Sequence, residues 1–151
     1  GKGEAGMATL TRTVAIDAPV DKVFALALDI GKFWKWTDFA LTGIDLKPEG
    51  VGSSAILYGH VLAIHVEGLI TYTEVVPNER IVAQVGFGPE HPTWTFTFEP
   101  VVDRTELTAQ GEWHVNVPGI GNRMEGMLVK EHEKGLETML RSFKAEVEGT
   151  G

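Results

Sequence analysis

The sequence predicts an α+β fold in which an antiparallel sheet packs against one long C-terminal helix. Two observations predict it. Residues from Ser53 to Val115 read as alternating strands joined by short turns, and residues from Asn122 to Glu148 carry one amphipathic helical pattern. Because the apolar faces of a sheet and a helix both need a partner, the helix must pack on the concave face of the sheet. One helix covers a broad curved sheet incompletely, which favours an apolar cavity for a small hydrophobic molecule.

Length and composition are those of one globular domain. The chain has 151 residues, within the usual single-domain range of about 100–200. We expect the domain to span residues 7–149 and residues 1–6 (GKGEAG) to be an expression remnant. There is no cysteine, so neither disulfides nor thiolate chemistry is expected, and this fits a cytoplasmic protein.

Charge and hydropathy exclude two classes of partner. The net charge is −8, from 13 basic and 21 acidic residues, whereas a nucleic-acid groove or a site for an anionic membrane surface needs a basic patch. No apolar run approaches about 20 residues, so no membrane span is expected. We therefore expect neither nucleic acid nor a membrane-spanning segment.

The first part of the chain predicts a strand, two short helices and a second strand. The first strand covers Thr9–Ile16 and is ended by Pro19, because proline cannot donate to the ladder. Apolar residues then recur at spacings of three and four, which is typical of a short helix: Val20, Val23, Phe24, Ala27 and Leu28. A further helical turn is predicted over Lys32–Trp36, and a strand over Leu41–Leu46.

The middle of the chain predicts two long strands, Ser53–Tyr58 and Ala63–Val75, joined by a turn near Gly59-His60. In the second of these strands we expect the even-numbered residues to face inward and His65 and Glu67 to face outward. The apolar Leu69 leaves the opposite orientation open. The inward set would be Ile64, Val66, Gly68, Ile70 and Tyr72.

Three further strands follow. Alternation over residues 81–87 predicts one strand, and Trp94, Phe96 and Phe98 on one face of the next give the clearest two-residue period in the chain. A hairpin loop over Glu99–Arg104 should lead into the last strand, up to Val115. The final helix then carries one apolar stripe: Met124, Met127, Leu128, Leu136, Met139, Leu140, Phe143 and Val147.

Four local segments resemble the helix-grip superfamily, which includes START lipid-transfer domains, birch-pollen-allergen-like proteins and bacterial polyketide cyclase/dehydrase-like proteins (SRPBCC). They are residues 14–24 (VAIDAPVDKVF), 29–36 (DIGKFWKW), 73–81 (TEVVPNERI) and 98–108 (FEPVVDRTELT). The resemblance implies a curved antiparallel sheet of about seven strands wrapped around the C-terminal helix, with two short helices after the first strand. It also implies an apolar cavity between sheet and helix, but no single reaction.

Aromatic and methionine side chains are the main candidates for contacting a ligand, since methionines adapt to irregular contents. The alternative is that these residues fill an ordinary core. Gly135 would make room either for a ligand or for a closely packed strand. The ligand-binding candidates are Trp34, Tyr58, His60, Val66, Ile70, Tyr72, Val85, Phe87, Trp94, Phe96, Trp113, Met124, Met127, Leu128, Glu131, Gly135 and Met139.

Evidence for catalysis is weak. His60, near the predicted turn, and Glu131, on the final helix, are the only acid–base candidates, and Arg12 or Arg123 could anchor an anionic ligand head. His132-Glu133 begins like a zincin motif, but Leu136 stands where the second histidine would be needed. No histidine pair has helical i, i+4 spacing. We therefore expect no metal and no cofactor.

Three functional hypotheses follow. The first is binding or carriage of a small hydrophobic or aromatic molecule, lipid-like or polyketide-like, by a monomer or weak homodimer. The second is a polyketide cyclase or dehydratase type of enzyme that uses His60 or Glu131 in the same cavity. The third is a protein-interaction module whose core is filled by its own side chains.

Overall fold

In the computed structural model, the described residues are 6–35, 39–61, 63–86, 92–115 and 122–149, with side-chain detail for all of these except 6–8, 61, 113–115, 122–129 and 131. The elements are β1 (Gly6–Ile16), α1 (Val20–Leu28), α2 (Ile30–Phe33), β2 (Ala40–Asp45), β3 (Ser54–Val61), β4 (Ile64–Val76), β5 (Arg80–Gly86), β6 (Thr93–Val101), β7 (Arg104–Val115) and α3 (Asn122–Gly149).

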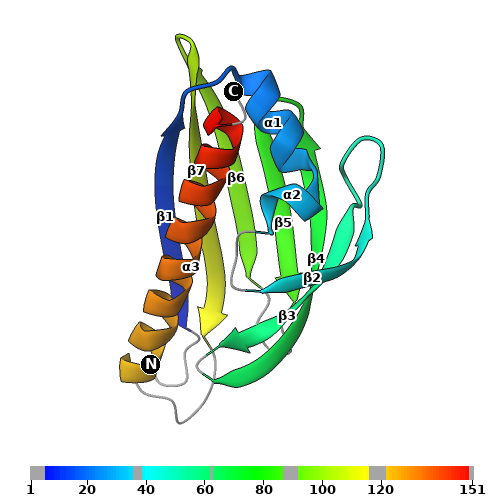
Figure 1. The fold of residues 1–151 in the computed structure, drawn as a ribbon. Helices are drawn as coiled ribbons and strands as arrows, with labels where there is room; N and C mark the ends of the chain where they lie inside the picture. The colour runs from blue at the N-terminus through cyan, green and yellow to red at the C-terminus, as the bar shows by residue number, and fades with distance from the viewer. Residues whose placement is uncertain (1–5, 36–38, 62, 87–91, 116–121, 150–151) are drawn as a thin grey trace.

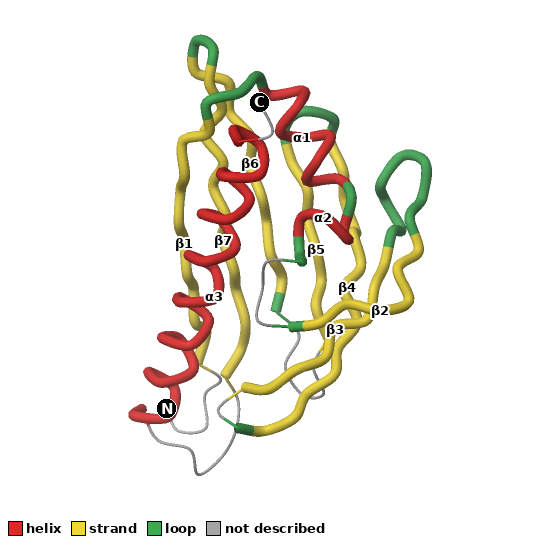
Figure 2. Tube along the Cα trace, in the orientation of Figure 1, coloured by secondary structure: helices red, strands yellow, loops and turns green. Residues whose placement is uncertain are grey.

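The seven strands form one antiparallel sheet in the order β1-β7-β6-β5-β4-β3-β2. The sheet curves around α3, which runs alongside β1 (Figure 1). The two short helices lie at the same end of the sheet as the C-terminal end of α3 (Figure 2). The helix-grip fold expected from the sequence is therefore confirmed.

Strand register determines which residues face α3. Cross-strand partners such as Leu57 and Gly68, or Trp94 and Gly111, share a face because side chains alternate along each strand. On β4 the even-numbered Ile70 and Tyr72 are completely buried, whereas Leu69 is 52% exposed. Ile70 and Tyr72 therefore face inward, as predicted, whereas Ile64 of the same predicted set is 66% exposed at the start of the strand.

The end of the fold that holds the short helices is filled by aromatic rings. The ring of Phe33 meets Phe96 at a centroid distance of 4.8 Å and Phe143 at 4.7 Å, both edge to face. Phe24 and Phe98 form a similar pair at 5.2 Å. Such pairs contribute about 0.5–1.5 kcal/mol each beyond simple burial, so this half of the interior is a packed core.

Three sides of α3 meet different surroundings. Its central stripe is buried: Leu136, Met139, Leu140, Phe143 and Val147. On one flank, Glu133 and Glu137 accept hydrogen bonds from Arg12 of β1. On the other flank, Glu146 forms a 3.3 Å ion pair with Lys35, which follows α2. This second flank therefore faces the half of the sheet that contains β2 and β3.

Two predicted turns are placed wrongly. The β3–β4 turn is not at Gly59-His60, because β3 continues to Val61. Gly59 belongs to the strand, and a Cβ there would come within 2.6 Å of the Phe39 ring, so this glycine makes room for an aromatic side chain. The predicted loop over residues 99–104 is also too long, because β6 extends to Val101 and β7 begins at Arg104.

The boundary between the short helices has a local cause. The side chain of Asp29 accepts a 2.9 Å hydrogen bond from the backbone N–H of Gly31, which caps the start of α2. This helix therefore covers Ile30–Phe33, earlier than the predicted Lys32–Trp36, and Trp34 follows its last residue.

Candidate ligand-binding site

The concave face of the sheet is covered unevenly. Towards the short helices, the inward residues Ile70 and Tyr72 of β4 are completely buried. Further along the same face, towards the turn with β3, Val66 and Gly68 are only half-buried although they point inward. The inner face therefore becomes accessible towards the β3–β4 turn.

Gly135 of α3 faces this less covered region. It lies eleven residues, or about three helical turns, before Glu146, so both are on the flank of α3 that faces β2 and β3. Gly135 is half-buried, and a Cβ at this position would find no atom within 4 Å. Of the two roles considered for this glycine, the absence of any close strand favours the one that leaves open space.

Aromatic and aliphatic side chains form the inner wall nearby. Trp94 lies flat over Gly111, where a Cβ would be 2.6 Å from the indole ring, and stacks on Phe96 at a centroid distance of 6.4 Å. Val85 is buried on the adjacent strand. We refer to the inward residues of this region as the open end: Val66, Gly68, Val85, Trp94 and Gly135.

Tyr72 and Trp34, two of the candidates for contacting a ligand, are buried in the core. The Tyr72 hydroxyl donates a 2.7 Å hydrogen bond to the carbonyl of Ala27 and accepts one of 3.3 Å from Trp34 Nε1. Complete burial raises the pKa of Tyr72 far above its usual value, because the phenolate would lose its hydration. Both polar groups are thus engaged in joining the short helices to β4. Ile70, Phe96 and Met139 are likewise buried core residues.

Tyr58 and His60, two of the candidates for contacting a ligand, lie on the outer face of the sheet. On β3 the buried residues are the odd-numbered Ala55 and Leu57, and Tyr58 is 39% exposed on the opposite face. His60 is exposed on that same outer face, opposite His65 of β4. Because Leu57 pairs with the inward Gly68 of β4, the even-numbered residues of β3 are on the opposite, outer face.

Several candidates lie outside the described residues or side chains. Phe87 is outside the described residues, and the side chains of five further candidates are outside the described ones: Trp113, Met124, Met127, Leu128 and Glu131. The same holds for Arg123. Arg12 is engaged with the two carboxylates on α3.

The sequence reasoning missed one residue near the interior, His132. It lies one turn before Leu136 and two turns before Met139, on the buried stripe of α3, and it is half-buried. Its spacing of four residues to Leu136 and seven to Met139 could have placed His132 on the apolar stripe, but the sequence analysis treated it only as part of a possible zinc motif.

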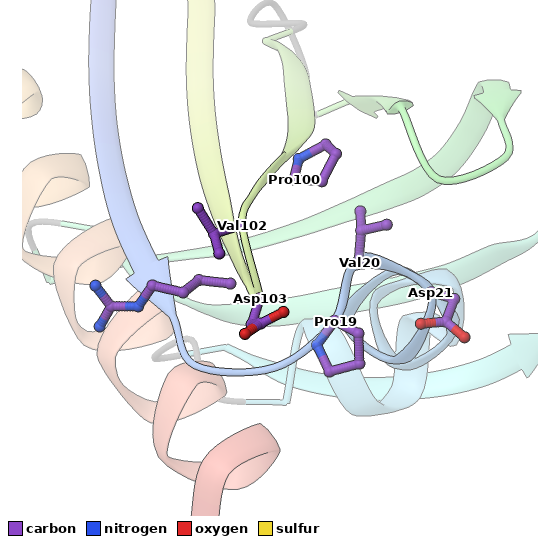
Figure 3. Close-up of a pocket in the computed structure, with 7 residues that line it drawn as sticks. Pro19, Val20, Asp21, Pro100, Val102 and Asp103 are labelled. Carbon is purple, nitrogen blue, oxygen red and sulfur yellow. The ribbon is translucent and has the colours of Figure 1, made fainter.

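A separate pocket of about 400 Å³ lies at the other end of the sheet, between the start of α1 and the β6–β7 turn (Figure 3). Its lining includes Pro19, Asp21 and Asp103, and the tip residue Val102 is 93% exposed. This pocket opens beside surface turns and is separated from the open end by the aromatic core. It is therefore not the candidate site.

Known structures share this fold. The protein TTHA0849 from Thermus thermophilus superimposes with a TM-score of 0.78 at 17% identity, over 95% of this chain and 99% of that one. A START superfamily protein from Mycobacterium smegmatis superimposes with a TM-score of 0.75 at 16% identity, over 97% of this chain and 100% of that one. The protein Ara h 8.0201 superimposes with a TM-score of 0.65 at 13% identity, over 94% of this chain and 98% of that one. This chain thus shares the helix-grip fold of these structures.

The sequence profile described as "Polyketide cyclase / dehydrase and lipid transport" matches residues 7–148. The chain belongs to this family. Comparison with curated protein sequences gave no match. Among the described residues, no helix combines the length and apolar character needed to cross a membrane.

Proposed function

We propose that this protein binds a small hydrophobic or aromatic molecule between the sheet and α3, at the open end. The observation that carries the proposal is the change along β4, from completely buried Ile70 and Tyr72 to half-buried Val66 and Gly68 on the same inward face. Gly135 supports it from the opposite wall, since a side chain there would project into open space.

The chemistry of the region suits an apolar ligand. Its described walls are aliphatic and aromatic, with glycines at two of the five positions of the open end. Burial of about 200 Å² of apolar ligand surface would contribute about 5 kcal/mol before the costs of association. The membership of a family whose description includes lipid transport supports the same ligand class.

Binding is better supported than acid–base chemistry. Among the side chains that the structure describes, which do not include Glu131, Tyr72 is the only buried ionisable one, and its hydroxyl hydrogen-bonds with Ala27 and Trp34. His60, one of two acid–base candidates, is on the outer face. No observation on the described residues favours the cyclase or the filled-core hypothesis over binding.

A fluorescent probe tests the proposal. We expect 1-anilinonaphthalene-8-sulfonate to bind saturably at one site per chain, and at least one compound from a panel of fatty acids, flavonoids and quinones to displace it. The control is Leu69→Ser, which removes an exposed apolar side chain from the outer face and should leave probe binding unchanged. Absence of saturable binding by the folded protein, or its loss in Leu69→Ser, would contradict the proposal.

A further inference from the structure

Two histidines face each other on the outer surface of the β3–β4 hairpin. His60 and His65 are direct cross-strand partners, one pair before the turn. Their rings lie 5.4 Å apart, centroid to centroid, at an interplanar angle of 70°. His60 is exposed, and the side chain of His65 is 58% exposed. Neither ring therefore contributes to the core, and both side chains are accessible to solvent.

This separation matches a metal chelate. With metal–nitrogen bonds of about 2.0–2.1 Å, a metal ion would lie about 3.2 Å from each ring centre, and a tetrahedral angle would then separate the centres by about 5.2 Å. The observed 5.4 Å is close to that value. Facing positions on antiparallel strands fix the two Cβ atoms about 4.5–5.5 Å apart, so little chain entropy is lost when both rings bind one ion.

A carboxylate adds negative charge at the pair. Glu67 lies two residues beyond His65 on the same face of β4, and its Oε2 is 3.9 Å from His65 Nε2. At this distance the carboxylate does not hydrogen-bond the ring, but its negative charge favours a cation beside the pair. The described residues hold no ready-made group of three or more histidine, cysteine or acidic side chains around a metal position, so water would complete the coordination.

We infer that His60 and His65 form a two-histidine chelate for a divalent late transition metal ion. Imidazole pairs suit Zn²⁺, Ni²⁺ and Cu²⁺, and affinity at a given site is highest for Cu²⁺ in this series. The site is on the opposite face of the sheet from the open end, so it is independent of the proposed ligand binding.

The test is a Cu²⁺ titration of the 151-residue chain carrying no added histidine tag, followed by calorimetry and visible absorption. We expect one ion per chain at this site, and His60→Ala and His65→Ala should each weaken binding at least about tenfold. His132→Gln, which removes a histidine from α3, is the matched control and should bind as the wild type does. Equal affinity in the wild type and in both alanine variants would overturn the inference.

A second measurement needs no variant. Paramagnetic Cu²⁺ at substoichiometric amounts should broaden the ring signals of His60 and His65 in NMR spectra before those of the other three histidines. Earlier broadening of another histidine would place the tightest site elsewhere and would also overturn the inference.

Discussion

The hydroxyl of Tyr72 donates a 2.7 Å hydrogen bond to the backbone carbonyl of Ala27, forty-five residues earlier in the chain. This carbonyl lies in the last turn of α1, where carbonyl groups have no partner within the helix. The same hydroxyl accepts from Trp34 Nε1. One buried oxygen therefore joins β4 to both of the segments that cover this end of the sheet.

Tyr72→Phe should lower the free energy of unfolding by about 1–3 kcal/mol, because it leaves the Ala27 carbonyl and the Trp34 indole N–H without this partner in the interior. The matched control is Tyr58→Phe, which removes the same atom from the outer face and should change stability by less than about 0.5 kcal/mol. Urea unfolding of both variants measures the difference. Equal effects would show that the buried network does not stabilise the fold.

Ionisation of Tyr72 should lower the free energy of unfolding at alkaline pH. Burial raises the pKa of Tyr72 in the folded chain, whereas an unfolded tyrosine has a pKa of about 10. The contribution of the neutral hydroxyl is therefore fully present below about pH 10 and is lost as the pH rises further, by up to about 1.4 kcal/mol per pH unit.

The chain has two tyrosines, so Tyr72 is the one that remains in the Tyr58→Phe variant. In this variant the phenolate absorbance of Tyr72 should rise only together with the loss of far-ultraviolet circular dichroism. A rise in absorbance while the protein is still folded would contradict the assignment. Stability of Tyr72→Phe should also fall less steeply above about pH 10 than that of the wild type.

Two glycine-to-alanine changes should have opposite signs. Gly111→Ala places a Cβ within 2.6 Å of the Trp94 ring and should destabilise the protein by about 1–3 kcal/mol. Gly135→Ala meets no atom within 4 Å and should stabilise α3 by up to about 1 kcal/mol, because alanine is the better helix former. Thermal or urea unfolding checks both, and destabilisation by Gly135→Ala would mean that this flank of α3 is tightly packed.

The contact of Arg12 with Glu133 and Glu137 should contribute little to stability. The three side chains are 37%, 35% and 52% exposed, and solvent-exposed ion pairs usually contribute about 0–1 kcal/mol. Arg12→Met keeps an apolar stem and should cost no more than about 1 kcal/mol at low salt, with a smaller loss in about 1 M NaCl. A double-mutant cycle with Glu133→Gln gives the coupling energy; a large coupling that salt does not reduce would contradict this expectation.

Local pattern predicted most of the fold. Trp94, Phe96 and Phe98 indicated β6 because a half-buried strand alternates with a period of two, and the spacing of apolar residues located α1 and α3. The exact positions of the turns were harder to predict. In the sequence Gly59 resembles a turn residue, whereas in the structure it lies within β3 and makes room for the Phe39 ring. That distinction depends on a residue twenty positions away.

The candidate site was predicted less well. Tyr58 was suggested as a ligand contact by its residue type, and His60 by its place near the predicted turn, but cross-strand pairing decides which face of β3 each residue occupies. Because Leu57 pairs with the inward Gly68, Tyr58 and His60 lie on the outer face, where His60 meets His65. The engagement of Tyr72 with Ala27 and Trp34 could not be predicted either, because it joins segments that meet only in the folded chain.

The most direct test of ligand binding at the open end compares probe affinity in the wild type, Gly135→Leu and Gly149→Leu. Both glycines are in α3, and a Cβ at either position would meet no atom within 4 Å, but Gly149 is the exposed last residue of the helix. We predict that Gly135→Leu remains folded and weakens probe binding at least about tenfold, equivalent to about 1.4 kcal/mol, while Gly149→Leu binds as the wild type does. Unchanged affinity in folded Gly135→Leu would contradict the proposed site.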